Sequence, residues 1–319
     1  MPDAKQIRRI PHLPPRPADG HKGTFGRVLA ISGSVGMAGA PSLVGNAALR
    51  SGAGLVTIAV PEPVLNVVAG LCPCATTIPL PADDAGQIKP AAAAKLLRSR
   101  GWIGSKEKAN PPNALVVGPG VGTGAHDYAE NFWTLIDAFR IRSGTPVVID
   151  ADALNLAALL ANGWDCRPHP RSIFTPHPGE LARMLRISTR DVQADREKIA
   201  IETARRLNAQ TEPADRAVLV LKGAGTVVTD GESIYVNKTG NPGMATGGSG
   251  DVLSGVLAAL LAQGMSGLDA AIFGVYVHGL AGDLAARRLG QISLTAADII
   301  DSLPAAFTAS AKTKSPSKR

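Results

Sequence analysis

Residues 28–60 read VLAISGSVGMAGAPSLVGNAALRSGAGLVTIAV, and this stretch decides the expected fold. It opens with a short apolar run, 28–32, whose pattern predicts a buried strand. A glycine loop, 33–39, leads into a predicted helix over residues 41–51, and a second apolar strand is predicted over residues 55–60. A strand–helix–strand unit implies two parallel strands joined by a right-handed crossover.

The same alternation continues along the rest of the chain. Further strands are predicted over residues 114–117, 146–149, 172–175 and 218–221, and helices over residues 125–140, 153–161, 178–185, 191–208, 251–262, 268–289 and 296–303. Asp230-Gly231, between the runs 226–229 and 233–237, predicts a hairpin. Together these elements predict one three-layer α/β/α domain over residues 25–304, with a mostly parallel central sheet.

The net charge of +7 comes from the two ends of the chain. Residues 1–24 carry a net +3 and residues 305–319 a net +4, so the segment between them is neutral as a whole. We therefore expect a basic, Pro-rich, flexible arm and a basic disordered tail, and no nucleic-acid-binding face. The low aromatic content, 4%, also argues against a platform that stacks sugars or single-stranded nucleic acid.

Composition also indicates the expected compartment. The sequence has no apolar run of about 18 residues, so no membrane span is predicted. No apolar segment follows the basic N-terminal residues, as it would in a signal peptide. The three cysteines, Cys72, Cys74 and Cys166, show no zinc-ligand spacing and are odd in number. These features predict a cytoplasmic protein with reduced thiols and no membrane partner.

Two glycine loops follow predicted strands. The first has the spacing G-x-x-G-x-x-G, which departs from the dinucleotide-binding fingerprint, and no G-K-[ST] sequence of a P-loop occurs. Its glycines either allow a tight turn or let a ligand approach the backbone. The second loop, residues 118–124, lies where the carboxyl ends of parallel strands place ligands.

Polar side chains end the next two strands. Asp150, Asp152 and Asn155 can hold a metal or a substrate hydroxyl, or Asp152 can simply cap the following helix. His177 lies between two prolines that fix its backbone direction, which favours a ligand contact over a purely structural role. Glu180 can also be an acid in the first turn of a helix, where its negative charge interacts favourably with the helix dipole.

Two further segments point to phosphate. Residues 222–226, KGAGT, either bring a lysine and backbone amides to an anion or form a turn with a solvated lysine. Residues 241–251, NPGMATGGSGD, place a glycine run at the start of an apolar helix, where free amides form an anion hole. Asp251 is then either a base beside that hole or a plain helix cap.

Taken in order, these segments resemble one family. The set comprises the loop 33–39 with Ala40, AALRSGAG (47–54), GPGVG (118–122), DADAL (150–154), TPHPGE (175–180), KGAGT (222–226) and NPGMATGGSGD (241–251). It resembles the ADP/ATP-dependent NAD(P)H-hydrate dehydratases, the YjeF C-terminal-type proteins of the ribokinase-like carbohydrate kinase superfamily. The resemblance covers residues 25–304. The family usually has Thr where Ser249 stands, and serine keeps the hydroxyl.

The resemblance implies a ribokinase-like fold and a repair activity. The expected reaction returns the S epimer of hydrated NADH or NADPH (NADHX or NADPHX) to NAD(P)H, with ADP or ATP as co-substrate and Mg²⁺ as cofactor. We expect ADP as the donor. A homotetramer is also implied. Only about 24 residues precede the match, so we expect the partner epimerase to be a separate protein.

The resemblance also assigns roles to residues. Asp251 is the expected catalytic base and a substrate contact, and Ala40, Gly120 and His177 are expected to line the hydrate. The expected nucleotide-binding residues are Lys222, Gly223, Ala224, Gly225, Thr226 and Gly250. The expected anion hole is made by Gly247, Gly248, Ser249 and Gly250. No residues are assigned to the metal.

Three alternative functions stay open from the sequence. The first is a kinase of the same superfamily acting on a hydroxymethyl or hydroxyethyl vitamin precursor or on a sugar. It would share the glycine run and Asp251, but the TPHPGE and NPGMATGG segments weigh against it. The second is a nucleotide-binding regulatory module without turnover, which would bind ADP and release no AMP. The third is a nucleic-acid binder, whose binding would depend on the two basic ends.

Overall fold

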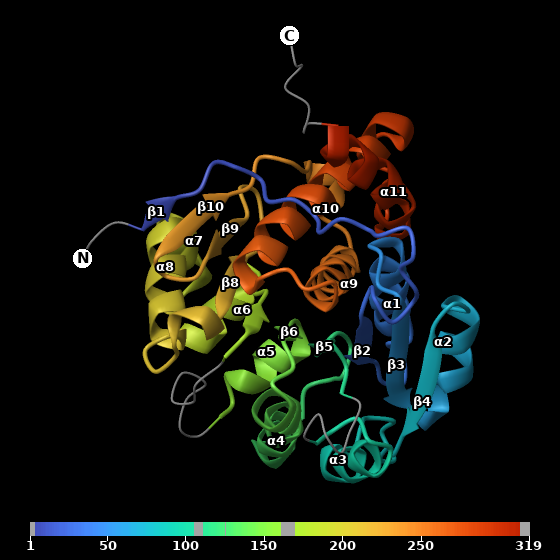
Figure 1. Ribbon diagram of the computed structural model, residues 1–319. Helices are drawn as coiled ribbons and strands as arrows, with labels where there is room; N and C mark the ends of the chain where they lie inside the picture. The colour runs from blue at the N-terminus through green and yellow to red at the C-terminus, as the bar shows by residue number, and fades with distance from the viewer. Residues whose placement is uncertain (1–3, 105–110, 125, 161–169, 313–319) are drawn as a thin grey trace.

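The computed structural model describes residues 4–104, 111–124, 126–160 and 170–312 (Figure 1). The described chain forms a ten-stranded sheet in the order β1-β10-β9-β8-β7-β6-β5-β2-β3-β4. The strands are β1 (Lys5–Gln6), β2 (Arg27–Ile31), β3 (Leu55–Pro61), β4 (Thr76–Leu80), β5 (Ala114–Val117), β6 (Val147–Ile149), β7 (Ser172–Phe174), β8 (Val218–Leu221), β9 (Val227–Thr229) and β10 (Ser233–Val236).

Every neighbouring pair from β4 through β8 is parallel. β9 lies antiparallel between β8 and β10, as the Asp230-Gly231 hairpin signal predicts. The predicted α/β class with a mostly parallel sheet is therefore confirmed. Since parallel strands end on the same side, their carboxyl ends gather the loops that follow them at one edge.

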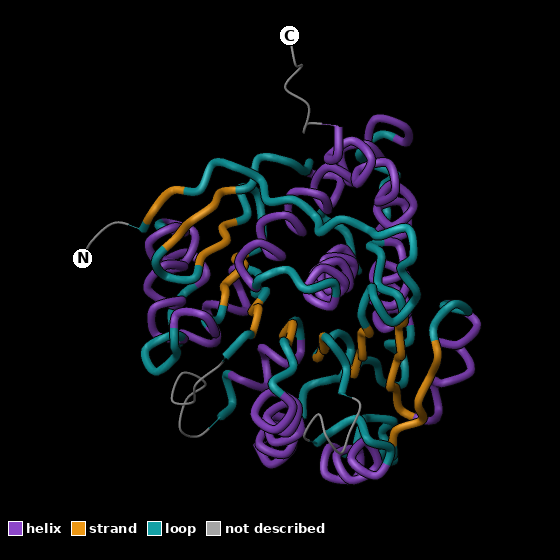
Figure 2. Tube along the Cα trace, viewed as in Figure 1, coloured by secondary structure: helices purple, strands orange, loops and turns teal. Residues whose placement is uncertain are grey.

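Helices cover both faces of the sheet (Figure 2). One layer contains α1 (Gly39–Arg50), α2 (Leu65–Leu71), α9 (Ser249–Ala262), α10 (Gly267–Leu289) and α11 (Ala296–Lys312). The other contains α3 (Pro90–Ser99), α4 (His126–Ser143), α5 (Asp152–Ala157), α6 (Pro178–Leu185), α7 (Thr189–Ala194) and α8 (Arg196–Leu207). Short 3₁₀ turns occur at Glu62–Val64, Pro213–Asp215 and Pro242–Met244.

The most apolar helix is also the most enclosed. α9 is buried from Val252 to Ala262 and lies between the sheet, α1 and α10. A helix that is apolar on all sides is expected to be covered on all sides. The neighbouring α10 is long and apolar enough to cross a membrane by length and composition, but 67% of its apolar window is buried inside the fold. That is the environment of a core helix.

The N-terminal segment differs from the expected flexible arm. Lys5 and Gln6 pair in parallel with β10 at the edge of the sheet, and Ile7, Ile10 and Leu13 contact the hydrophobic core. Arg16 stacks on the Phe25 ring and donates to the carbonyl of Gly52. The prediction of a flexible arm rested on its charge and proline content. It did not consider the apolar residues between them, whose burial against the core stabilises this segment.

The C-terminal part also differs from the prediction. The last helix was expected to end at residue 303, but α11 runs to Lys312, with Ala306 and Ser310 buried. Pro304 is tolerated inside it. Residues 313–319 of the predicted tail lie outside the described residues, as does Cys166. Part of the predicted basic tail is therefore a helix that packs on the core.

Two more differences concern helices. The helix predicted over residues 191–208 is two helices, because Asp195 leaves the helical conformation and caps α8 by accepting the Lys198 amide. The elements β4, α2 and α3 had no prediction. Between residues 62 and 113 the apolar runs are short and broken by prolines and polar residues, so their periodicity is weak.

Candidate active site

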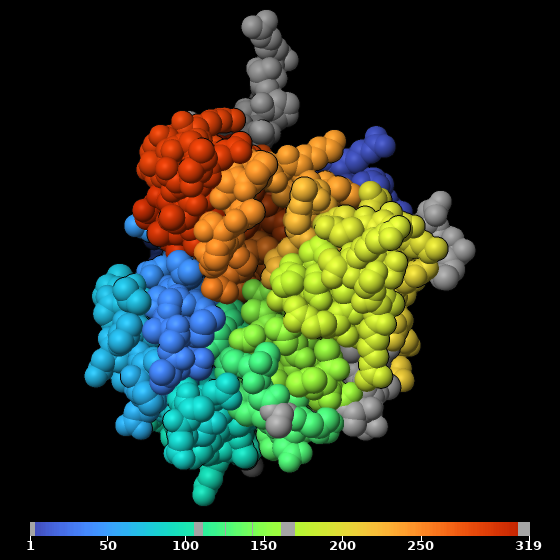
Figure 3. Space-filling model, turned by 180° about the vertical axis from the view of Figure 1, so that it is seen from behind, coloured from blue at the N-terminus to red at the C-terminus, as the bar shows by residue number. Residues whose placement is uncertain are grey.

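Loops from five neighbouring strands meet at the carboxyl edge of the sheet. They follow β2, β5, β6, β7 and β8, and α9 begins beside them. The view from behind shows blue, green and orange portions of the chain meeting near the centre of one face (Figure 3). Segments up to 200 residues apart in sequence are thereby brought to one place.

A cavity of about 730 Å³ opens between the loop after β8, the start of α9 and α10. Every residue predicted to bind the nucleotide lines it. The lining comprises Lys222, Gly223, Ala224, Gly225, Thr226, Asn237, Lys238, Thr239, Gly240, Asn241, Pro242, Met244, Ala245, Ser249, Gly250, Leu253, Val275, His278 and Gly279. Its volume is within the range of small-molecule and cofactor sites.

The residues of the predicted anion hole lie together at the start of α9. Gly248 is the N-cap, with φ +88°, a conformation that favours glycine. The amides of Gly250 and Asp251 make no hydrogen bond to the described residues, and a Cβ added at Gly247 would meet no atom within 4 Å. Ser249 turns its hydroxyl to the carbonyl of Met244, 2.8 Å away. Free amides at the positive end of a helix dipole attract an anion.

Asp251 is not the cap of this helix. It is the third residue of α9, no side chain caps that helix, and its carboxylate accepts no hydrogen bond from the described residues. The capping interpretation of Asp251 is therefore wrong. Burial, and next the charge of Asp150, raise its pKa to about 7, although Lys222 opposes the shift. A half-buried carboxylate with a pKa near neutrality suits proton transfer at neutral pH.

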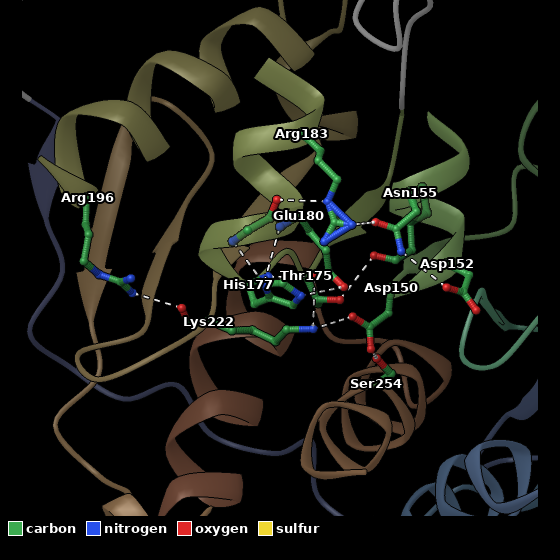
Figure 4. Close-up of polar contacts among 12 residues, drawn as sticks. Asp150, Asp152, Asn155, Thr175, His177, Glu180, Arg183, Arg196, Lys222 and Ser254 are labelled. Atoms are coloured by element: carbon green, nitrogen blue, oxygen red, sulfur yellow. Dashed lines mark hydrogen bonds and ion pairs between the residues drawn. The ribbon is translucent and has the colours of Figure 1, made fainter. Parts of the chain in front are cut away.

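Asp150 and Lys222 form an ion pair (Figure 4). The Lys222 Nζ atom donates to Asp150 Oδ1 at 2.6 Å and lies 3.8 Å from Glu180 Oε2. Asp150, which is 1% exposed, accepts a second hydrogen bond from Ser254 on Oδ2 at 2.7 Å. Burial disfavours the charge of Lys222, but the carboxylates together more than offset this and raise its pKa. Lys222 is thus held by carboxylates rather than solvated.

His177 is the N-cap of α6. Its Nδ1 accepts from the Gly179 amide at 3.0 Å and the Glu180 amide at 3.4 Å, while Glu180 accepts from the His177 amide. The Nε2 atom lies 3.3 Å from Glu180 Oε1. Burial, followed by the charges of Lys222 and Arg183, lowers the pKa of His177. Both ring nitrogens are therefore engaged within this capping box.

Glu180 completes the same box and is 7% exposed on its side chain. Burial raises its pKa to about 7, against the opposing charge of Lys222. The interpretation of Glu180 as a first-turn acid is confirmed in part, because it also faces Lys222. The capping box therefore joins α6 to the charged cluster.

Ala40 and Gly120 lie together, apart from the cavity. A Cβ added at Gly120, where φ is +66°, would lie 3.2 Å from Cβ of Ala40. The Gly122 amide on the same loop donates to Asp152 Oδ2 at 2.9 Å. Asp152 therefore binds a neighbouring loop instead of capping its own helix, α5. His177 and Asp251 are the other residues predicted to contact the hydrate, and Asp251 follows Gly250, which lines the cavity.

Several polar residues of the site carried no prediction. Ser254 stands alone among apolar residues one turn after Asp251, a spacing that could have indicated its contact with a buried group. Asp283 accepts from the Gly240 amide and from Asn241, and it thereby holds the cavity loop. His278 is 9% exposed and its Nε2 is unpaired, and burial lowers its pKa to about 4. No local pattern predicts these long-range contacts.

Metal-ligand clusters of three or more His, Cys, Asp or Glu side chains are absent from the described residues. This matches the usual way in which Mg²⁺ binds with nucleotides, through one or two carboxylates, the phosphates and water. Asp150 Oδ2 would lie 3.7 Å from a Cβ added at Gly250, so a carboxylate is present at the anion hole. The residues present therefore fit a phosphate-bound magnesium ion.

Comparisons with known proteins identify a family. The family model for NAD(P)H-hydrate dehydratase matches residues 28–305. The chain is 37% identical over 287 residues to the ADP-dependent (S)-NAD(P)H-hydrate dehydratase of Neisseria meningitidis, covering 88% of this chain and 85% of that protein. It is 43% identical over 298 residues to the bifunctional NAD(P)H-hydrate repair enzyme Nnr of Moorella thermoacetica, covering 92% of this chain and 51% of that protein.

The chain thus spans about half the length of the first curated relatives it matches. Among solved structures it is similar to the ADP/ATP-dependent NAD(P)H-hydrate dehydratase of Bacillus subtilis, which was co-crystallized with ATP and Mg²⁺. The TM-score is 0.75 at 30% identity, and the match covers 93% of this chain and 94% of that one. With its ribokinase-like fold and a family match over most of its length, the chain belongs to the NAD(P)H-hydrate dehydratase family.

Proposed function

We propose that the protein dehydrates the S epimer of hydrated NADH or NADPH, with ADP as the phosphoryl donor and AMP and phosphate as by-products. One observation carries the proposal: Asp251, whose carboxylate has no hydrogen-bond partner among the described residues, lies in the first turn of α9, directly after Gly250, which lines the 730 Å³ cavity. A base and an anion hole are thus adjacent to a space of the right size for a nucleotide.

The reaction follows from the poor leaving ability of hydroxide. Asp251 takes the proton of the ring hydroxyl while that oxygen attacks the terminal phosphorus of ADP, and the bond between phosphorus and the AMP oxygen breaks. The ring nitrogen then expels phosphate from the adjacent carbon. Loss of a proton from the neighbouring ring carbon restores the double bond of NAD(P)H. The oxygen of the hydrate therefore leaves in the phosphate.

We assign the remaining residues to binding either ADP or the hydrate. The glycine turn after Lys222 and the amides of α9 receive the phosphates of ADP, and Asp150 fixes Lys222 between the carboxylates. Ala40 and Gly120 leave room for the ring of the hydrate. When bound with the nucleotide, Mg²⁺ would be held by the phosphate oxygens and water and would neutralise charge on the phosphates, while Asp150 stays paired with Lys222 and Ser254.

A spectrophotometric assay tests the function. The protein is incubated with hydrated NADH, Mg²⁺ and either ADP or ATP, and absorbance at the NADH band is followed together with release of AMP or ADP. Recovery of NADH coupled to nucleotide cleavage supports repair. A stable phosphorylated vitamin precursor, with hydrated NADH left intact, would instead support a kinase of the superfamily. Binding of ADP with no AMP formed would support a regulatory module.

The wider setting is part of the same proposal. The relative from Moorella thermoacetica is named as a bifunctional repair enzyme, which supports a functional link between this activity and an epimerase that supplies the S form. We propose that the protein acts in the cytoplasm, where NADH and NADPH are formed and used, as a homotetramer. Light scattering at several protein concentrations measures the oligomeric state.

A further inference from the structure

Arg183 is an exposed cation that is held in a fixed direction by neutral groups (Figure 4). Its Nε donates to the Gly179 carbonyl at 3.2 Å, and one terminal nitrogen donates to Asn155 Oδ1 at 2.8 Å. No carboxylate among the described residues lies within ion-pair distance of it. An arginine oriented by neutral acceptors keeps its full charge for another anion.

The surrounding charges make such an anion site necessary. Asp150, Glu180 and Asp251 lie around Lys222, whose ammonium group is already paired with Asp150 at 2.6 Å. Above about pH 7, where Glu180 and Asp251 lose their protons, the carboxylates outnumber the one cation of this cluster. A dinucleotide carries a pyrophosphate, so a negative substrate approaching this cluster is repelled unless another cation meets its phosphates.

Arg183 lies on the hydrate side of the site rather than on the nucleotide side. A chain of hydrogen bonds joins it, through Asn155 and Asp152, to the Gly122 amide on the loop that carries Gly120. It is not among the residues that line the 730 Å³ cavity. Its charge adds to burial and the charge of Lys222 in lowering the pKa of His177, and it opposes the rise that burial causes in the pKa of Glu180.

We propose that Arg183 binds a phosphate group of the dinucleotide hydrate. This inference rests on the proposed function and adds a substrate contact to it. The planar guanidinium group still has a free terminal nitrogen, which can pair with phosphate oxygens in the manner that guanidinium and phosphate groups favour. The phosphate in question is either part of the pyrophosphate or the 2′-phosphate that distinguishes NADPH from NADH.

The primary test measures steady-state kinetics of the full chain with Arg183→Met and Arg183→Lys. With saturating ADP, Arg183→Met is expected to raise KM for hydrated NADH or NADPH roughly 10-fold or more, and Arg183→Lys is expected to raise it less. The kcat value should change little, because the contact does not involve the reacting atoms. Arg190→Met, an exposed arginine on the neighbouring α7, is the matched control and should behave as wild type.

Three substrates distinguish the phosphates. Hydrated reduced nicotinamide mononucleotide has only the phosphate next to the nicotinamide ribose, hydrated NADH adds the second, and hydrated NADPH adds the 2′-phosphate. A KM increase shared by all three identifies the first phosphate. An increase limited to the two dinucleotides identifies the second, and one limited to hydrated NADPH identifies the 2′-phosphate. Each of these results supports the proposal.

Two further measurements separate phosphate binding from a structural role. The KM of the wild type should rise with salt, and the rise should be shallower in Arg183→Met. Asn155→Asp places a carboxylate beside the guanidinium group of Arg183 and neutralises its charge without removing it. This variant should also raise KM for the hydrate, as Arg183→Met does. Unchanged KM for all three substrates, or a loss of kcat or melting temperature alone, overturns the proposal. A wild type that fails to repair hydrated NADH contradicts the proposed function instead.

Discussion

The two sides of the site that we propose to bind the nucleotide and the hydrate, called the nucleotide side and the hydrate side, are built differently. The nucleotide side is a formed cavity whose walls come from the turn after β8, the start of α9 and the face of α10. On the hydrate side, the loop between β2 and α1 exposes Met37 (48%) next to Gly120 and Val35 (55%) next to Gly86. Asp251 lies in the first turn of α9, directly after the cavity-lining Gly250, and we assign it to the junction of the two sides.

The difference reflects what each side has to recognise. A walled cavity with backbone amides selects a nucleotide and its phosphates before any chemistry occurs. A surface with exposed apolar side chains accepts a large dinucleotide of which only the ring hydroxyl reacts. Substitutions on the two sides should therefore affect different kinetic constants, and those at the junction should affect turnover.

The largest effect is expected at the junction. Asp251→Asn keeps the shape of the side chain but removes the base, so turnover should fall by roughly 10²- to 10⁴-fold while ADP binding and melting temperature stay near wild type. Turnover is measured by NADH recovery and ADP binding by calorimetry. An Asn variant with near-normal turnover would remove Asp251 from the mechanism.

The pH dependence examines the same residue. Because the base must be deprotonated and its pKa is raised to about 7, kcat/KM should fall as pH decreases below about 7. Asp150→Asn removes a charge that raises this pKa, so the falling limb should move to lower pH. A limb that stays in place in Asp150→Asn would assign it to another group.

The next effect is expected on stability. Lys222→Met leaves the buried carboxylate of Asp150 without its cation, which typically costs about 3–5 kcal/mol. The double variant Asp150→Asn/Lys222→Met should recover part of this loss, because no buried charge is then left unpaired. Urea unfolding of the wild type and the two variants measures the difference. A loss in Lys222→Met below about 1 kcal/mol would show that water reaches Asp150.

A smaller effect, limited to ADP affinity, is expected from a substitution on the nucleotide side. Gly225 has φ +64°, so Gly225→Val strains the turn and places a branched side chain beside the cavity. ADP affinity should fall roughly 10-fold or more, whereas KM for the hydrate should change little. Gly264→Val is the matched control. Gly264 has φ +90° and no atom within 4 Å of its added Cβ, so strain without loss of ADP affinity is expected there.

The smallest effect concerns His177. His177→Ala removes the cap of α6, which typically costs about 0.5–2 kcal/mol, and it should raise KM for the hydrate more than it lowers kcat. The folded-state pKa of His177 is lowered, so its stabilising effect is present above its ordinary pKa of 6.5 and lost as pH falls. The melting-temperature difference between wild type and variant should therefore shrink from pH 8 to pH 5. A difference independent of pH would contradict the capping role.

Much of this arrangement could be predicted from local sequence. The strand–helix–strand unit, the glycine turn after β8 and the start of α9 each depend on residues that are neighbours in the chain, and the structure places them as expected. The paired strands β9 and β10 also followed from a two-residue turn signal. Local patterns succeed where the backbone conformation alone decides the structure.

Other features depend on contacts between distant residues. The pairing of β1 with β10 joins segments more than 220 residues apart, and two residues of a strand carry no periodicity of their own. The partners of Asp150, which are Lys222 and Ser254, come from two other elements. The role of His177 as the N-cap of α6 could not be predicted either. Its two flanking prolines are compatible both with a helix cap and with a ligand contact.

The most direct test of the central claim follows the oxygen of the hydrate. NADH is hydrated in ¹⁸O-labelled water to label the ring hydroxyl, and the labelled S epimer is then repaired in ordinary water with ADP and Mg²⁺. If Asp251 activates that hydroxyl for phosphoryl transfer, the ¹⁸O appears in inorganic phosphate, and AMP carries none. Recovery of NADH with the label released into water, and unlabelled phosphate, would contradict the phosphorylation step.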